Sequence, residues 1–144
     1  MSTRGQYAVR AMLVLALYSE AEPIPLRQVA EIEEISEQYL EQIFVDLRRS
    51  KLVRGVRGAR GGYQLTRPPS EITAGDIIRS VEGPIAPVEC VTQNPAEACN
   101  RVHLCVTHEL WVRLAESMSA VLDNTTLKDL VDLAAEKQRI MKGD

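Results

Sequence analysis

The sequence predicts a mainly α-helical fold with one two-stranded β-hairpin and a long helix near its C-terminal end. Apolar residues repeat at helical spacing in several segments of the 144-residue chain. The segment "LVRGVRGARGGYQLT" has instead two short runs of strand-forming residues around a tip rich in glycine and arginine, as in a β-hairpin. All three cysteines and both histidines fall within one stretch, "CVTQNPAEACNRVHLCVTH", residues 90–108.

Length and composition indicate a globular protein of one domain with an appended segment. No run approaches the ~18 uncharged apolar residues of a membrane span. Near the N-terminus, Arg10 interrupts the apolar run and no small-residue cleavage site precedes Glu20, so we expect a cytoplasmic chain without a membrane partner. An odd number of cysteines in a reducing compartment favours a metal site or a reactive thiol over a disulfide framework.

We expect one helix before the first proline-rich turn and a second helix just after it. The first, from about residue 3 to 19, presents one apolar stripe, which predicts a helix packed on a core. This stripe consists of Val9, Met12, Leu13, Ala16 and Leu17. Pro25 suits the first turn of a short second helix that continues through Ile32.

The segment "EEISEQYLEQIFVDLRRSKLV" predicts a third helix with Ser36 as its N-cap. Its apolar residues are Leu40, Ile43, Phe44 and Leu47, and the opposite face carries Gln38, Glu41, Val45 and Arg48. Two short helices joined by a tight turn, the second with a hydrogen-bonding outer face, are typical of a helix-turn-helix.

The β-hairpin that follows predicts a wing, with strands near Val53–Val56 and Tyr63–Thr66. Residues 44–67 contain one acidic residue, Asp46, although the whole chain has a net charge of -3. The basic residues of this range are Arg48, Arg49, Lys51, Arg54, Arg57, Arg60 and Arg67. This local positive charge predicts a winged helix-turn-helix that binds double-stranded DNA.

Candidate DNA contacts divide between the helix and the wing. Gln38, Glu41 and Gln42 have side chains that can hydrogen-bond to base edges in the major groove. Arg57 and Arg60, at the hairpin tip, suit a minor groove or the phosphate backbone. The full predicted set is Gln38, Tyr39, Glu41, Gln42, Arg48, Arg49, Arg57 and Arg60.

The C-terminal part predicts an interface between two copies of the chain. After a helix capped near Thr73, the segment from about Thr107 to Asp123 has a wide apolar stripe. Such a face needs a partner, and its twin in a homodimer is the simplest one. We expect the last segment, from Thr126, to fold back on this interface. The predicted divisions are 1–84 (winged helix-turn-helix domain), 85–108 (cysteine-rich loop) and 109–144 (dimerisation and fold-back helices).

The cysteines and the second histidine have the spacing C-x8-C-x5-C-x2-H. Structural zinc usually takes closely spaced pairs such as C-x2-C, which are absent from the sequence. Three thiolates and an imidazole are sufficient for a 2Fe-2S cluster, whose bridging sulfides tolerate looser spacing. Zinc, a thiol-only redox switch and buried free cysteines remain alternatives. Cys105 and His108 lack an orienting third group and an oxyanion motif, so we expect no enzyme, no catalytic residue and no small-molecule substrate.

Four stretches, taken together, resemble the corresponding sequences of the Rrf-type family of bacterial winged-helix transcription regulators. Within this family the chain is most similar to the IscR-like iron-sulfur branch. The four stretches are "STRGQYAVRAM", "ISEQYLEQIFVDLRRSKLV", "VRGARGGYQL" and "CVTHELW". The resemblance implies a homodimeric repressor of iron-sulfur cluster biogenesis genes whose 2Fe-2S ligands are Cys90, Cys99, Cys105 and His108. It also implies that Glu41 contacts DNA in a way that changes with cluster occupancy, and that Arg57 is a wing contact.

Two departures concern the branch of this family. The first cysteine spacing is three residues longer than the common C-x5-C-x5-C form, a departure that concerns Cys90. The family's nitric-oxide sensors have a carboxylate ligand where this chain has Gln6, so a nitric-oxide or redox sensor ranks second. Its cysteine-metabolism regulators lack the ligand set and rank lower. A zinc-stabilised DNA-binding module is the remaining alternative.

Overall fold

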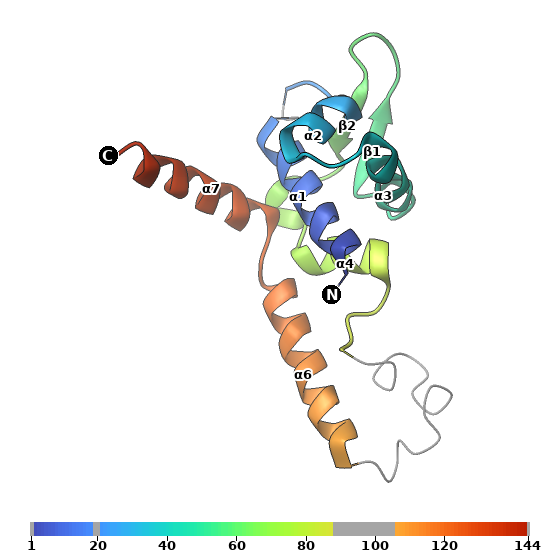
Figure 1. Cartoon of the computed structure of the whole chain (residues 1–144), viewed down its shortest axis with the longest axis vertical. Coiled ribbons are helices and arrows are strands. Elements are labelled where there is room, and N and C mark those ends of the chain that lie inside the picture. The colour runs from blue at the N-terminus through green and yellow to red at the C-terminus, as the bar shows by residue number, and fades with distance from the viewer. Residues whose placement is uncertain (1, 19–20, 88–105, 144) are drawn as a thin grey trace.

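The computed structural model describes residues 2–18, 21–87 and 106–143, and it has the predicted mainly helical winged-helix fold (Figure 1). In chain order the elements are α1 (Thr3–Tyr18), α2 (Leu26–Glu33), α3 (Glu37–Arg49), β1 (Val53–Val56), β2 (Gly62–Leu65), the 3-10 turn η1 (Pro69–Glu71), α4 (Ala74–Glu82), α6 (Val106–Asp123) and α7 (Leu127–Met141). The elements from α1 to α4 form one body, from which α6 and α7 extend in different directions.

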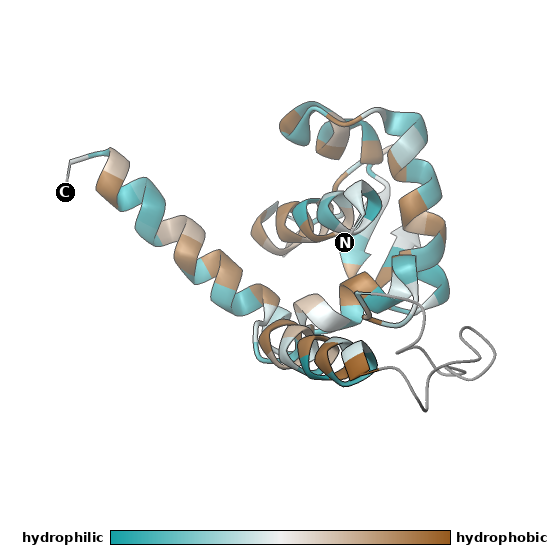
Figure 2. Cartoon of the chain, turned by 60° about the horizontal axis from the view of Figure 1, so that its bottom comes forward, coloured by the Kyte–Doolittle hydropathy of each residue, from teal (hydrophilic) through white to brown (hydrophobic). Residues whose placement is uncertain are grey.

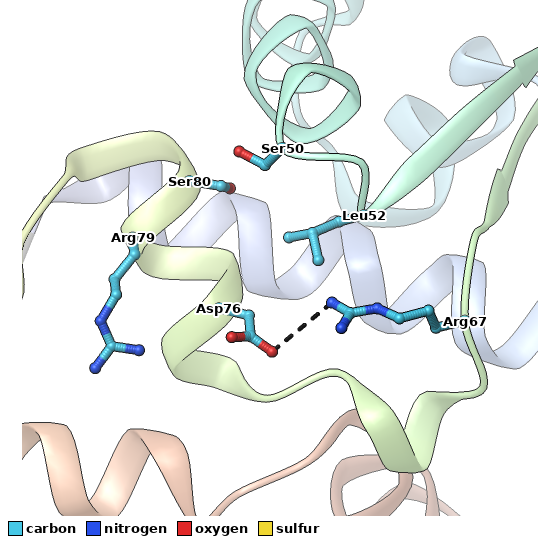
Figure 3. Close-up of a pocket in the computed structure, with 6 residues that line it drawn as sticks. All are labelled: Ser50, Leu52, Arg67, Asp76, Arg79 and Ser80. Atoms are coloured by element: carbon cyan, nitrogen blue, oxygen red, sulfur yellow. Dashed lines mark ion pairs between the residues drawn. The ribbon is translucent and has the colours of Figure 1, made fainter.

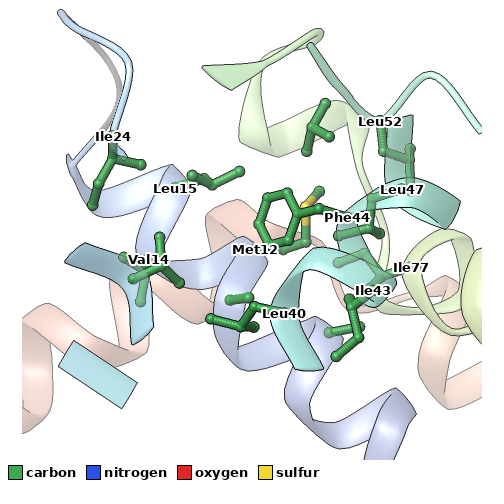
Figure 4. Close-up of a cluster of buried hydrophobic side chains, with 14 of the residues drawn as sticks. Met12, Val14, Leu15, Ile24, Leu40, Ile43, Phe44, Leu47, Leu52 and Ile77 are labelled. Atoms are coloured by element: carbon green, nitrogen blue, oxygen red, sulfur yellow. The ribbon is translucent and has the colours of Figure 1, made fainter. Parts of the chain in front are cut away.

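The core lies between α1, α3, α4 and the base of the wing (Figure 4). Leu40, Ile43, Phe44 and Leu47 of α3 are all fully buried, as their spacing predicts. The core face of α1 is wider than the predicted stripe, because α1 contacts α2, α3, α4, β2 and α7. Ala8, Ala11 and Leu15 are fully buried there, whereas the predicted Leu17 is 40% exposed.

The ends of the helices follow local side-chain chemistry. Ser36 caps α3, as predicted, and its hydroxyl oxygen accepts a hydrogen bond of 3.1 Å from the Tyr39 backbone N–H. Thr73 caps α4 in a reciprocal capping box with Asp76. Pro25 is the N-cap of α2 and lies just outside the predicted first turn. These caps set the direction in which each helix leaves the preceding turn.

The wing is the predicted antiparallel hairpin, with Val53 opposite Leu65 and Val56 opposite Gly62. Its second strand begins one residue earlier than expected, at Gly62. A backbone bridge that the sequence did not predict joins Ile24 to Tyr63 through two hydrogen bonds, of 3.0 and 2.9 Å. A side chain at Gly62 would place its Cβ 2.3 Å from the Ile24 carbonyl oxygen, so glycine allows this close approach.

The turn between α6 and α7 is tied to the body that α1 to α4 form. The Leu127 N–H donates to the Ile72 carbonyl at 2.9 Å, and the Leu127 side chain is fully buried in the core. Arg79 of α4 binds Asp123 at the end of α6 through two hydrogen bonds, of 2.6 and 2.8 Å. Hydrogen bonding from Arg79 lowers the pKa of Asp123, so the ion pair persists at neutral pH and weakens as the pH falls through that lowered value.

Helix α7 does not fold back on the apolar face of α6, as the sequence had led us to expect. Because Leu127 and Leu130 pack on the core of the body that α1 to α4 form, α7 starts against α1 and η1 and then extends away from α6 (Figure 1). Figure 2 shows apolar residues along both helices. The exposed ones include Leu110 (53%), Leu114 (40%) and Val121 (66%) on α6 and Leu133 (46%) and Ile140 (64%) on α7.

Candidate nucleic-acid interface

One face of α3 is exposed along its whole length. Gln38, Glu41, Gln42, Arg48 and Arg49 are all exposed, while the opposite face is buried in the core. Burial of one face and capping at Ser36 prevent the helix from rotating about its axis. The predicted base-contacting side chains therefore project together from a rigid support, as direct contact with base edges requires.

Helix α3 is also held from the N-terminal end of α1. The Arg4 guanidinium forms an ion pair with Asp46 and donates to the Gln42 backbone carbonyl at 3.3 Å. Asp46 has a second, longer contact of 3.8 Å to Arg49. Since Asp46 is the acidic residue of the range 44–67, its pairing with Arg4 leaves the exposed arginines of this range with little opposing charge.

Tyr39 occupies a different environment from the other predicted contacts on α3. It is half-buried, and its ring meets the Tyr7 ring edge to face, with centroids 5.7 Å apart and planes at 82°. The Arg10 guanidinium lies 5.2 Å from the centroid of the Tyr7 ring. This structure gives Tyr39 a packing role between α1 and α3, at the edge of the exposed face.

The wing tip presents Arg57 and Arg60, both exposed, around a tight turn. Gly58 has a φ of 113°, and the Gly61 N–H donates to the Gly58 carbonyl at 3.0 Å. A Cβ on Gly61 would lie 2.2 Å from the Val56 carbonyl oxygen, which no side chain tolerates. The glycines thus permit a narrow tip that carries two cations.

Helix and wing are packed together by aromatic contact. The rings of Phe44 on α3 and Tyr63 on β2 have centroids 4.7 Å apart. Lys51 makes the turn between α3 and β1 with a left-handed φ of 62°, and its carbonyl accepts a 2.6 Å hydrogen bond from the Thr66 hydroxyl. The structure therefore holds the exposed face of α3 and the wing in a fixed relative position.

Sequence reasoning did not identify three of these supports: Arg4, Tyr7 and the Ile24 bridge. Their partners lie far along the chain, so no local pattern marks them. The one available signal was the short polar start "STRGQY", whose arginine and tyrosine interrupt an otherwise apolar helix.

Among the predicted cluster ligands, His108 is the one that the structure describes. It lies in the first turn of α6 and is half-buried. Cys90, Cys99 and Cys105, together with His103, lie outside the described residues. Within residues 2–18, 21–87 and 106–143 there is no group of three histidine, cysteine or acidic side chains that would hold a metal ion.

An exposed, rigidly supported helix beside a basic wing defines the chain as a winged helix-turn-helix transcriptional regulator. The model of the Rrf2 family, described as "Iron-dependent Transcriptional regulator", matches residues 1–133. The chain belongs to the Rrf2 family. Its relatives are transcriptional regulators, so the chain is a DNA-binding regulator and not an enzyme.

Relatives of two kinds are similar to this chain. The HTH-type transcriptional regulator CymR of Bacillus subtilis is 42% identical over 139 residues, which cover 96% of this chain and 94% of CymR. The regulator IscR of Serratia proteamaculans is 42% identical over 132 residues, covering 92% of this chain and 79% of IscR.

Solved structures show the same two kinds. The structure of CymR, the global cysteine regulator of B. subtilis, has a TM-score of 0.75 and 42% identity, and the match covers 92% of this chain and 96% of CymR. The structure of T. potens IscR has a TM-score of 0.78 and 39% identity, and covers 96% of this chain and 90% of IscR.

Across the described part of the chain, no helix combines the length and apolar character needed to cross a lipid bilayer.

Proposed function

We propose that this chain is a cytoplasmic, homodimeric repressor that binds specific DNA sites through α3 and the wing and carries a 2Fe-2S cluster. The observation that carries the DNA-binding part is the packing of Phe44 against Tyr63, which joins α3, with its exposed polar face, to the wing whose tip carries Arg57 and Arg60. A duplex can then meet both elements at once, with α3 in the major groove and the wing on the backbone or the minor groove.

The donor set supports the cluster. Cys90, Cys99 and Cys105 supply thiolates, which iron favours, and His108 supplies a neutral imidazole at the start of α6. A bound 2Fe-2S cluster would supply a labile inorganic centre whose presence depends on the iron and sulfide supply of the cell. Because His108 belongs to α6, ligation by its imidazole would connect the cysteine-rich stretch to the proposed dimer helix.

The dimer part of the proposal rests on the exposed face of α6. Leu110, Leu114 and Val121 lie on one side of this helix, and an adjacent shallow apolar hollow is lined by Met118 and Leu122. Replacing both Leu110 and Leu114 with glutamate should convert dimers to monomers, since the new charges would be buried unpaired in the interface. The monomers should then no longer bind tightly to a duplex that carries two copies of the binding site. Analytical ultracentrifugation measures the change, and Leu133→Glu on α7 is the matched control. An unchanged dimer in the double variant would exclude this face.

A second candidate follows from the similarity to CymR: regulation of cysteine metabolism without a cluster. Nitric-oxide or redox sensing and a zinc-stabilised module are further alternatives. Oxygen-free purification followed by iron, acid-labile sulfide and zinc analysis separates them. Equal iron and sulfide, about two per chain, support the 2Fe-2S proposal. Zinc alone supports the module, and a colourless metal-free chain that still represses supports the CymR-like function.

Glu41 should select the base at one position of the site. A carboxylate accepts a hydrogen bond from cytosine N4 and is repelled by phosphate, so Glu41→Ala should relax one position's preference by about 1 to 3 kcal/mol. The same change should strengthen non-specific binding. Selection of bound duplexes from a randomised pool, at one fixed salt concentration, measures both. Glu136→Ala on α7 removes the same charge at a remote exposed site and should leave the preference unchanged. Identical preferences in the Glu41 variant would remove Glu41 from the interface.

A further inference from the structure

A cleft of about 560 Å³ opens between the base of the wing, the C-terminal end of α1, the turn before η1 and the first turns of α7. Ala16 of α1, Leu65 of β2 and Val131 of α7, all half-buried, give it apolar walls. Its volume falls within the range of small-molecule sites, about 300 to 1,000 Å³. It is distinct from the predicted DNA contacts and from the predicted cluster ligands, none of which line it.

The polar lining of this cleft is cationic. Arg54 of β1 and Lys128 of α7 line it from two sides, together with the neutral Gln64. Arg54 stands opposite Gln64 in the hairpin register and donates to its side-chain oxygen at 3.3 Å. No aspartate or glutamate is among the described residues that line this cleft. An anion entering it would therefore meet Arg54, Lys128 and a third cation, Arg67, beside the Gln64 amide, with no carboxylate among the described lining residues.

Within the described residues, neither Arg54 nor Lys128 is paired with a buried acidic side chain. Lys128 forms an ion pair of 2.7 Å with Asp132, but both side chains are more than half exposed, so water screens that pair. Arg67, which also borders the cleft, is turned mainly toward the smaller neighbouring pocket. There its guanidinium lies 3.9 Å from the Asp76 carboxylate (Figure 3). Arg54 and Lys128 are thus the cations available to a ligand.

We propose that this cleft binds a small organic anion with an apolar body, with its carboxylate between Arg54 and Lys128 and its hydrocarbon part against Leu65 and Val131. Apolar walls with a few converging polar groups are the usual composition of such sites. The inference goes beyond the proposed function and does not depend on it. Because the walls belong to both the wing and α7, a bound anion would connect the wing base to the C-terminal helix.

The test is a calorimetric titration of the full chain with octanoate and with octanamide, its uncharged match. We expect saturable binding of octanoate that is about tenfold tighter than that of octanamide, since a charge-assisted hydrogen bond has about this effect. Arg54→Gln and Lys128→Gln should each weaken octanoate binding by about tenfold while leaving circular dichroism unchanged. Lys137→Gln, an exposed cation of α7 outside the cleft, is the matched control and should bind like the wild type.

Other surfaces are distinguished by the same titration. Ile140→Gln, which changes an exposed apolar residue of α7 outside the cleft, should leave octanoate binding unchanged, and weakened binding would move the ligand to the far end of α7 and overturn the proposal. Equal affinities for octanoate and octanamide, or no saturation by about 10 mM, would also overturn it. If Arg54→Gln weakened binding to a DNA duplex but had no effect on octanoate, Arg54 would be a phosphate contact and the cleft would not be an anion site. The octanoate titration contains no DNA, so its result does not depend on whether the proposed regulator function is correct.

Discussion

Replacing Phe44 with alanine is expected to lower the free energy of unfolding by about 3 to 5 kcal/mol. Phe44 is fully buried between α1 and the wing, and its ring lies 4.7 Å from that of Tyr63. The substitution removes the apolar contacts of a whole ring and leaves a cavity that the surrounding helices fill only in part. Since small domains have total stabilities of about 5 to 15 kcal/mol, the substitution should remove between about a fifth and the whole of the stability. Urea unfolding followed by circular dichroism measures the change.

Two further variants separate the loss of volume from the loss of the aromatic contact. Phe44→Leu keeps most of the volume but removes the pairing of rings, whose own contribution is about 0.5 to 1.5 kcal/mol, so it should cost less than alanine. Val45→Ala changes the next residue, which is 43% exposed, and should alter stability by less than about 0.5 kcal/mol. A Phe44→Ala variant as stable as Val45→Ala would contradict the position of Phe44 in the core.

The consequence for DNA binding follows from what Phe44 joins. Its backbone belongs to α3 and its ring contacts the wing, so its truncation loosens the relative position of the two proposed DNA-binding elements. Phe44→Leu, which we expect to remain folded, should therefore lower DNA affinity although Phe44 itself cannot reach a duplex. Unchanged affinity in a folded Phe44→Leu variant would show that helix and wing do not need this contact.

The features that the sequence predicted are those that depend on residues close together in the chain. The inward residues of α3 repeat at helical spacing, Ser36 caps a backbone N–H three residues away, and the glycine-rich tip lies between two short strands. Each depends on neighbours in the chain, so periodicity and capping rules identify it. The recognition of the Rrf-type family is confirmed by the match over residues 1–133.

What the sequence did not predict depends on contacts between distant segments. Ile24 pairs with Tyr63, Arg4 with Asp46, and Leu127 of α7 enters a core built mainly by α1 and α3. An apolar residue near the start of a helix does not indicate which other helices will bury it. For this reason the expected fold-back of α7 on α6 differs from its packing on α1. The branch of the family is likewise not decided by overall similarity, since IscR and CymR relatives are equally identical to this chain, at 42%.

Replacing Cys105 with alanine should abolish cluster binding, the largest functional effect that we expect from one substitution. With this thiolate gone, the donor set falls to two thiolates and one imidazole, which leaves one iron coordination position without a protein ligand. Protein purified without oxygen should then lose its iron, its acid-labile sulfide and its visible absorbance. The sequence preference for duplex DNA, measured at one salt concentration, should become that of the metal-free wild type.

The two histidines offer a matched pair of controls for the same experiment. His108→Ala removes the imidazole that we assign as the fourth ligand and should lower iron retention, whereas His103→Ala removes a neighbouring imidazole that we do not assign and should retain the cluster. This contrast separates loss of a ligand from general disturbance of the stretch. If Cys105→Ala kept the wild-type spectrum and the wild-type choice of duplex, the cluster proposal would fail. The similarity to CymR would then favour a regulator of cysteine metabolism that acts without iron.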